Sequence, residues 1–490
     1  LACMTVASSL VATVATGVVT VGSFSMVYVA QQAEAASAPS STFSLRGPSS
    51  EGTGNMYVVD LSNLPVITGG SIDSDFSLVL GTDILPGLGL SDGGSADIIT
   101  LDTAFDTTAH NMTLIADFGT WKPLEDNNGD IIGWTEKIDD LRYTLAWSED
   151  GKALQITAAI PGTRWQDNSG LNIWAGKDAE GNEALVGAPD MVLNGNWTGG
   201  RPDMAGNKED DDIGDVVFTA GPEDVQIGGT VQADDITIAT NGEYNFQNLE
   251  TSSKTYEGIV DAAGALYLNK GTLNIDNTAT NFGEHSIVKA DGTLVLGNGE
   301  GSTIKTNFKG GLTNEGTLTV NPDTKLTIDS ELNNSGSITV IGGFDTTSGS
   351  DLEDTLVVNG TISNSNTIEL KDGAQAKAET LANSGTITIT EGELIVSGDV
   401  TDLDGTSGTI SLTKGSVSVE GNMTGSATIA DGSLEVKGTD GMTGDLALNQ
   451  SSSTATIAGN LTGGAANAKE MVQVLCADIL VKENCMVWNS

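Results

Sequence analysis

Short runs of alternating apolar and polar residues recur through the second half of the chain. In residues 311–340 the runs Thr317–Val320 and Ser337–Val340 each follow an Asn-x-Gly corner, and a further alternating run lies between them. An alternation with a period of two predicts a strand with one buried face, so Leu318 is expected to point inward and Thr317 outward. Each such strand is too short to bury a core alone.

The corner and the run that follows it recur at a nearly regular spacing. Equivalent corner positions are separated by 20, 30, 19 and 23 residues, and they are Gly316, Gly336, Asn366, Gly385 and Gly408. A second set of strands lies between these copies, at Lys325–Ile328, Thr355–Val358, Glu393–Val396, Ser416–Val419 and Ser433–Val436. A short unit that cannot bury its own core is typical of a repeat fold, in which stacked units bury one continuous core.

The pattern predicts an all-β fold, a parallel β-solenoid or β-helix, which we expect to be right-handed. An antiparallel meander of hairpins is the alternative, and it would need two-residue turns such as Asn-Gly directly between strands. In a solenoid, equivalent residues of successive units lie above one another, about 4.8 Å apart. We therefore expect one buried column that consists of Leu318, Ile338, Ile368 and Ile387.

Four asparagines stand before these strands at equivalent positions, and they are Asn314, Asn334, Asn364 and Asn383. Asparagine tolerates a left-handed backbone, which suits the turn before a strand. Gly316 and its equivalents are expected to adopt the positive φ of the bend. Asparagines stacked one unit apart can also form a ladder of amide groups.

Composition and charge narrow the class of partner. The 490 residues include 62 Gly but 10 Pro, and 66 acidic residues against 21 basic ones give a net charge of −45. Such a charge repels nucleic acid and anionic lipid, so neither is an expected partner.

The cysteines are Cys3, Cys476 and Cys485, and the thiol-free chain between Cys3 and Cys476 is what we expect of an exported protein. Cys476 and Cys485 could pair, but zinc would need more ligands than the tail supplies.

The two ends differ from the repeats. Residues 1–36 resemble a signal peptide, because an uncharged apolar stretch runs into Ala33-x-Ala35, the spacing of a signal-peptidase site. A basic n-region is missing and Leu1 is not Met, so we expect the true start to lie upstream; a transmembrane anchor is the alternative. Residues 466–490 form a non-repeat tail, expected to reflect truncation, a frame change or a short cap.

Residues 43–170 are expected to form a β-rich N-terminal domain, and residues 171–465 the solenoid. Several strand-like segments precede the repeats, and Glu149-Asp150-Gly151 predicts a hairpin turn between two of them. This domain is either a β-sandwich or a cap over the first open turn of the solenoid. Both arrangements would protect an edge that otherwise invites aggregation.

A motif at the start of the repeats resembles a known family. Paired tryptophans precede an Asp-x-x-Phe element, a Val-rich strand and a closing Tyr-x-Phe, and the matched residues are Trp174, Trp197, Asp215, Phe218, Val231, Ile236, Ile238, Tyr244 and Phe246. This is similar to the passenger region of bacterial autotransporters, in the variety with autotransporter-associated β-strand repeats, over roughly residues 170–465. The resemblance implies export to the cell surface, the outer membrane or the medium of a Gram-negative bacterium.

Members of that family end in an outer-membrane β-barrel of alternating ten-residue segments with aromatic girdles. The sequence after Ala430 lacks such segments, and Trp488 is the one aromatic residue of the tail. We therefore expect either a fragment that lacks the C-terminal barrel or export by other machinery. Beyond Phe246 the resemblance is compositional, so it implies architecture more than activity.

Two acidic stretches are candidate metal sites. Asp126, Asn128 and Asp130 alternate as in a calcium loop, but Gly129 stands where the EF-hand pattern does not place glycine and Lys137 occupies its twelfth position. A hairpin tip at Asn128-Gly129 is the simpler expectation. The acidic run 209–215, which includes Asp210, is expected to be a solvated loop, with calcium as the alternative. No metal, cofactor or catalytic residue is therefore predicted.

The enzymatic alternative is a polysaccharide lyase or glycosidase on a β-helix. No His-Glu-x-x-His motif occurs, and His110 and His285 stand in different regions without a cysteine partner nearby. All four arginines precede the aligned corner copies, which begin at Asn314: they are Arg46, Arg142, Arg164 and Arg201. A carboxylate pair for glycoside hydrolysis remains open, because an acidic β-helix offers many.

Aromatic residues favour a non-enzymatic protein. Residues 247–487 contain Tyr256 and Tyr267 but no Trp, whereas six Trp residues lie between 121 and 197. If a glycan binds, the N-terminal half is therefore where we expect it, with core packing as the alternative role of those tryptophans. We predict a structural or adhesive surface protein that contacts host or cell-surface glycans or copies of itself.

Overall fold

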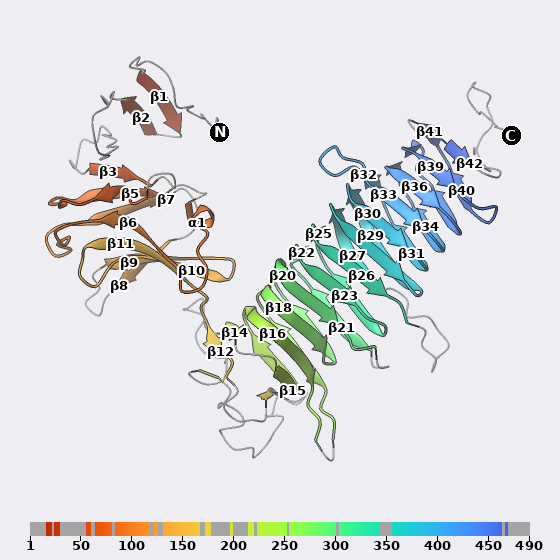
Figure 1. The fold of residues 1–490 in the computed structure, drawn as a ribbon, viewed down its shortest axis with the longest axis horizontal. Helices are drawn as coiled ribbons and strands as arrows, with labels where there is room; N and C mark the ends of the chain where they lie inside the picture. Colours follow the sequence, from red (N-terminus) through yellow and green to blue (C-terminus); the bar gives the residue numbers. More distant parts are fainter. Residues whose placement is uncertain are drawn as a thin grey trace. The chain divides into compact units, whose positions relative to one another are not determined.

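The computed structural model describes residues 16–21, 24–29, 55–59, 64–80, 84–116, 121–125, 131–166, 172–177, 197–198, 214–219, 223–251, 254–299, 303–343, 355–462 and 466–468. The chain divides into two compact units, Leu1–Ile160 and Pro161–Ser490. Regular structure in the described residues consists of strands, apart from the four-residue helix α1 (Ile84–Gly87) (Figure 1). The predicted all-β class is confirmed.

The described residues of the first unit form three separate sheets. β1 (Thr16–Val21) and β2 (Phe24–Val29), inside the segment interpreted as a signal peptide, form an antiparallel pair. β3 (Asn55–Val58), β5 (Phe76–Leu80) and β7 (Met112–Ala116) form a parallel sheet. A six-stranded sheet has the order β4-β6-β11-β10-β9-β8, with β4 at Ile67–Thr68, β6 at Ser95–Thr100, β8 at Lys122–Glu125, β9 at Ile131–Ile138, β10 at Leu141–Trp147 and β11 at Ala153–Ala159.

Alternating residues of these sheets build one core. Phe76, Leu78 and Leu80 of β5 are buried in the same cluster as Leu145 of β10 and Ile156 of β11. Trp121, Trp134 and Trp147 pack against this cluster while partly exposed, and the ring of Trp147 stacks on Phe105 with centroids 4.8 Å apart. These three tryptophans therefore contribute to core packing, the alternative role considered for them.

The hairpin predicted at residues 149–151 is confirmed. β10 and β11 pair antiparallel from Arg142 opposite Ala159 to Trp147 opposite Leu154. Gly151 has φ of 68°, and its N–H donates to the Ser148 carbonyl at 2.7 Å. The hydrogen bond from the Ser148 hydroxyl lowers the pKa of the Asp150 carboxyl, and the Lys152 N–H adds to the effect.

The second unit is one parallel sheet of 31 strands, β12 to β42, wound into a solenoid (Figure 1). Its opening strands are β12 (Thr163–Arg164), β13 (Ile173–Ala175), β14 (Val216–Phe218), β15 (Glu223–Ala233), β16 (Ile236–Asn248), β17 (Gly258–Ala262), β18 (Leu266–Asp276), β19 (Ala279–Phe282), β20 (Ser286–Leu296) and β21 (Ile304–Phe308). The predicted parallel solenoid is confirmed, while its handedness stays a prediction.

Each turn of the solenoid, here called a coil, contributes to three faces, because each strand pairs with its equivalent one coil later. Face one contains β22 (Leu312–Asn314), β25 (Leu332–Asn334), the ends of β27 (Leu356–Asn364) and β29 (Ala374–Asn383), β32 (Val400–Thr401), β35 (Met423–Thr424), β38 (Gly441–Thr443) and β41 (Asn460–Thr462).

Faces two and three complete each coil. Face two contains β23 (Thr317–Val320), β26 (Ser337–Ile341), β28 (Thr367–Lys371), β30 (Thr386–Ile389), β33 (Thr409–Leu412), β36 (Ser426–Ile429), β39 (Leu446–Leu448) and β42 (Ala466–Ala468). Face three contains β24 (Thr324–Ile328), the beginnings of β27 and β29, β31 (Gly392–Val396), β34 (Gly415–Val419), β37 (Ser433–Val436) and β40 (Thr454–Ile457).

The predicted apolar column lies inside face two. Leu318 pairs with Ile338, Ile338 with Ile368, and Ile368 with Ile387. All four side chains are at most 3% exposed. They belong to one apolar cluster that continues along the solenoid, so each coil is stabilised by the burial of its neighbours rather than by its own core.

The asparagine ladder is confirmed, but its backbone conformation differs from the expectation. The Nδ2 of Asn314 donates to Asn334 Oδ1 at 2.8 Å, Asn334 to Asn364 at 2.7 Å, and Asn364 to Asn383 at 2.8 Å. These residues end the strands of face one, point into the core and do not have positive φ. Their amide groups bond one another inside the solenoid instead of supporting a left-handed turn.

The reason for the corner glycines also differs from the expectation. Gly316, Gly336 and Gly385 do not have positive φ. A Cβ on Gly336 would lie 2.1 Å from the carbonyl oxygen of Gly316, and one on Gly385 would lie 2.0 Å from that of Asn366. Glycine is required because backbones of successive coils approach closely at this corner.

The motif residues that resemble the autotransporter repeat lie in the first coils of the solenoid, where aromatic rings fill the interior. Trp165, Trp174 and Trp197 are buried there, and the rings of Trp165 and Trp197 meet edge to face at 4.8 Å. Phe218 contacts Tyr244 and Phe246 in the same cluster. All nine matched residues, from Trp174 to Phe246, are at most 4% exposed, so they build the core rather than a binding surface.

Candidate functional site

The outward side of face two carries two columns of hydroxyl groups, and we call this surface the hydroxyl face. Strand registers place the first column at Thr317, Ser337, Thr367, Thr386, Thr409 and Ser426. The second column is Thr319, Thr339, Glu369, Thr388, Ser411 and Thr428. The first column also continues toward the start of the solenoid through Thr293 and Thr272.

The columns arise from the same alternation that builds the core. In each strand of four or five residues the apolar positions point inward, and the intervening threonines or serines point outward. β-branched threonine fits a pleated, half-buried surface, which accounts for its frequency. The equivalent coils then align these residues one above another along the solenoid.

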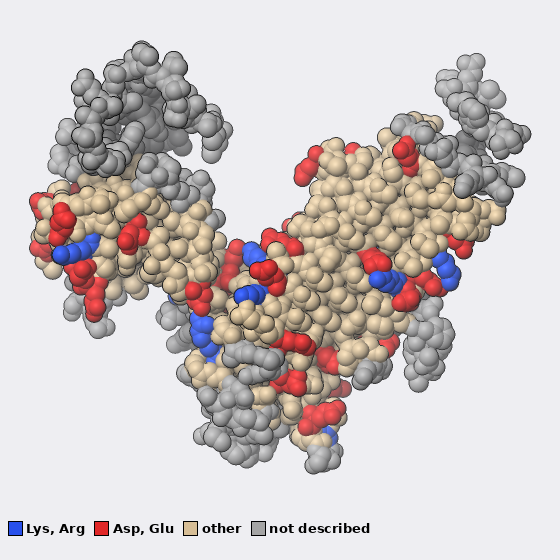
Figure 2. Space-filling view, in the orientation of Figure 1, with Lys and Arg blue, Asp and Glu red and all other residues tan. Residues whose placement is uncertain are grey.

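The hydroxyl face has little charge. In β23, β26, β28, β30, β33 and β36 the charged residues are Glu369 and Lys371, and their side chains form an ion pair at 2.8 Å. Over the same coils face three carries five charged residues, Lys325, Lys377, Glu379, Glu393 and Glu435. Figure 2 shows one side of the molecule, where the solenoid surface is mainly uncharged and acidic residues form separate groups.

Many hydroxyls of this face are free to contact a ligand. In the described part of the chain, Thr319, Thr339 and Thr388 have no side-chain hydrogen bond to another protein group. Ser337 and Thr317 lie 3.5 Å apart through their oxygens, and the Thr367 hydroxyl donates to Asn366 Oδ1 at 3.2 Å. The face therefore offers donors, acceptors and methyl groups in a regular order.

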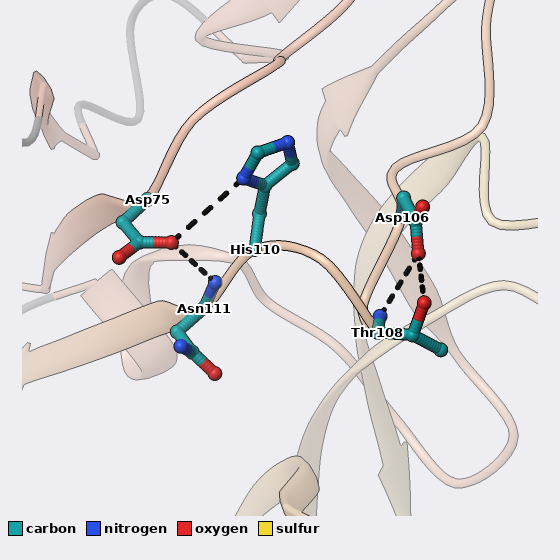
Figure 3. A network of polar contacts seen from close by, with 5 residues as sticks. All are labelled: Asp75, Asp106, Thr108, His110 and Asn111. Atoms are coloured by element: carbon teal, nitrogen blue, oxygen red, sulfur yellow. Dashed lines mark hydrogen bonds and ion pairs between the residues drawn. The ribbon is translucent and has the colours of Figure 1, made fainter.

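His110 lies in a polar turn of the first unit. Figure 3 shows its ring beside Asp75, with Nδ1 3.9 Å from Oδ1, while the same carboxylate accepts the Asn111 N–H at 2.9 Å. Asp106 accepts hydrogen bonds from the hydroxyl and N–H of Thr108, and the hydroxyl contact is the main cause of its lowered pKa. These contacts stabilise the loop before β7.

His285 belongs to the solenoid, so the sequence interpretation that the two histidines stand apart holds. Its Nε2 lies 2.8 Å from the Thr313 hydroxyl and its Nδ1 3.2 Å from the Gly310 carbonyl. Both contacts tie one coil to the next. In these networks His110 contacts no Ser, Thr or Cys side chain, and His285 contacts a hydroxyl but has a backbone carbonyl rather than a carboxylate at its other ring nitrogen.

The acidic stretches give no metal cluster within the described residues. Asp126, Asn128, Asp130 and Asp210 lie outside those residues, as do the three cysteines. β8 and β9, which flank residues 126–130, pair antiparallel. Asp215 is buried and its Oδ1 accepts the Asp235 N–H at 3.1 Å, so it joins two coils. The part of the chain that the structure describes holds no group of three or more His, Cys, Asp or Glu residues able to bind a metal.

Arg142 and Arg164 are described and Arg46 and Arg201 are not, so the structure describes two of the four arginines. Arg142 lies in β10 of the first unit, and Arg164 lies in β12, the first strand of the solenoid. On the later coils the cations are lysines: Lys414 pairs with Glu391, and Lys437 with Glu420 at 2.6 Å. Hydrogen bonds to these glutamates raise the pKa of both lysines.

Within the described ranges, no helix has the length and apolar character needed to cross a membrane. The outward direction of Thr317 and Thr319 and rows of hydroxyl groups follow from the sequence, whereas the residues that share each column follow from the register between coils. The sequence signal for these columns is the recurrence of Thr-x-Thr or Ser-x-Thr in the same phase after each Asn-x-Gly corner.

No family model matches the sequence, and the comparisons with curated proteins and with solved structures find no match either.

Proposed function

We propose that this chain is a non-enzymatic, exported protein of the autotransporter passenger type, with a structural and adhesive role at a Gram-negative cell surface or outside the cell. The observation that carries the adhesive role is the hydroxyl face, two aligned columns of Ser and Thr along successive coils. Partners that suit it are host or cell-surface glycans, or other copies of the chain.

The passenger-type assignment is supported by the motif at the start of the solenoid. Trp174, Trp197, Phe218, Tyr244 and Phe246 belong to one aromatic cluster inside the first coils. Export agrees with the thiol-free stretch between Cys3 and Cys476. The net charge of −45 keeps such a rod soluble.

Adhesion through this face would depend on the number of contacts made at the same time. A single hydroxyl contact exposed to water contributes little net free energy, since the same group bonds water when free. Repetition of the contact along the solenoid makes later contacts effectively intramolecular, and the apparent affinity rises steeply. Display of many chains on one cell multiplies the effect again.

Binding of the purified, fluorescently labelled chain to whole cells, neutral glycan arrays and immobilised copies of itself tests the proposal. We expect binding to at least one of these surfaces, and we expect Thr388→Lys to weaken it by placing a charge in the second column. Ser418→Lys is the matched control, because Ser418 points outward from β34 on face three. A chain that binds none of these surfaces, or binds them equally after Thr388→Lys, would contradict the adhesive role.

A further inference from the structure

The hydroxyl face is a two-dimensional net rather than a row. Successive coils repeat about every 4.8 Å along the solenoid, and residues two apart on one strand lie about 6.6 Å apart. Thr317 and Thr319 of β23 thus form one edge of the net, and Ser337 and Thr339 of β26 form the next. The pattern continues to β36 with Glu369 as the one position that is neither Ser nor Thr.

Three properties of this net limit the ligand. Its strands contain no aromatic side chain on which a sugar ring could stack. It is nearly uncharged in a chain of net charge −45, so it suits a neutral partner better than an ionic one. Each threonine also carries a hydroxyl group, which hydrogen-bonds water, and a methyl group, which does not.

A flexible ligand loses conformational entropy when it matches a fixed net, whereas a crystalline ligand matches many positions at once without that cost. Ice is a neutral solid whose surface consists of hydrogen-bonding oxygens in two-dimensional rows at spacings of this order. Water held between the two columns would be ordered by hydroxyls on both sides and by the methyl groups beneath. Ice could then add to that ordered layer.

We propose that the hydroxyl face binds the surface of ice. This inference rests on the contact role proposed above and names the ligand of the same face. The ion pair of Glu369 and Lys371 interrupts the net at β28, because charged groups order water differently from a lattice of neutral hydroxyls. Binding should therefore improve when both members of the pair are replaced together.

Ice-affinity partitioning of the labelled 490-residue chain, with thermal hysteresis of the same samples, tests the inference. We expect the parent chain to enter a growing ice hemisphere and to depress the freezing point below the melting point. Thr388→Lys should abolish both effects, and Ser418→Lys should leave both unchanged. Circular dichroism checks that each variant keeps the strand content of the parent.

The double variant Glu369→Thr/Lys371→Thr provides a gain that misfolding cannot imitate. We expect larger thermal hysteresis than that of the parent chain at equal concentration. Exclusion of the parent chain from ice, as for an unrelated acidic protein, would overturn the inference, and so would a double variant without any gain. If the chain stays out of ice but still binds cells or glycans in a Thr388-dependent manner, the inference fails and the proposed function stands.

Discussion

At the scale of single residues, the asparagine ladder is the feature of the solenoid interior whose buried polar groups depend most on hydrogen-bond partners. Asn364 accepts a hydrogen bond from Asn334 and donates one to Asn383, and all three side chains are buried. Asn364→Ala would remove both bonds and leave the Asn383 oxygen without its partner. We expect a loss of about 2 to 3 kcal/mol in the free energy of unfolding, measured by urea denaturation.

The matched control is Asn333→Ala. Asn333 precedes Asn334 in β25, so its side chain points outward from the same strand. We expect this change to cost less than about 0.5 kcal/mol, as for other surface substitutions. Equal effects of Asn364→Ala and Asn333→Ala would show that the buried amides contribute nothing specific. The ladder starts at Asn314. Its Oδ1 is buried without a hydrogen bond, and the equivalent residue of the preceding coil is Val288.

The corner glycines give a second prediction at this scale. Gly336→Ala would push a Cβ against the Gly316 carbonyl, and a backbone atom of a packed coil cannot move away cheaply. Gly373 has φ of 85° but open space around it, so Gly373→Ala costs the left-handed conformation alone, about 1 to 2 kcal/mol. We expect Gly336→Ala to lower the melting temperature more than Gly373→Ala, and the opposite order would contradict the close backbone approach as the reason for glycine at the corner.

At the scale of elements, the coil is the unit that can be removed. Asn364 and Asn383 are equivalent positions 19 residues apart, so deletion of residues 365–383 removes one coil and joins equivalent corners. Nearest-neighbour stacking predicts that the shortened chain folds, with a smaller urea m-value because less surface is exposed on unfolding. Deletion of 367–371 alone removes one strand of face two and leaves its coil open.

The two deletions can be compared by circular dichroism and urea denaturation. We expect the whole-coil deletion to retain cooperative unfolding and the strand content per residue of the parent chain. The single-strand deletion should lose cooperativity over the coils after β28, since Thr386–Ile389 would have no correct partner. Equal behaviour of the two variants would contradict the coil as the structural unit.

Much of the solenoid could be predicted from the sequence because its signal is local. The inward direction of Leu318, Ile338, Ile368 and Ile387 follows from alternation, and their stacking follows from the repeat. The three-residue strands of face one were missed, since Leu312–Asn314 is too short for a periodic pattern and ends in a residue typical of turns. Asn314 points inward only because Asn334 offers it a partner one coil later, which a single unit cannot reveal.

The alignment of the hydroxyl face also depends on contacts between coils, which a single repeat unit does not reveal. Alternation predicts that Thr319 and Thr339 point outward, but their alignment depends on register between coils. The interval between corners varies from 19 to 30 residues, so spacing alone does not show which residues lie side by side. The structure shows which residues are aligned. Insertions fall between strands, and after each insertion the pairing resumes at the equivalent residue.

At the scale of the whole molecule, the last prediction separates an adhesive rod from a carbohydrate-active enzyme on the same scaffold. The purified chain is expected to release neither reducing ends nor unsaturated products from a panel of acidic and neutral polysaccharides. Apart from Glu369, which is paired with Lys371, the two columns of face two consist of Ser and Thr. Their unactivated hydroxyls neither donate nor accept protons efficiently near neutral pH. On the later coils, two of the carboxylates, those of Glu391 and Glu420, are each paired with a lysine. Product above a heat-denatured control, abolished by changing one aspartate, would move the protein to the enzyme class.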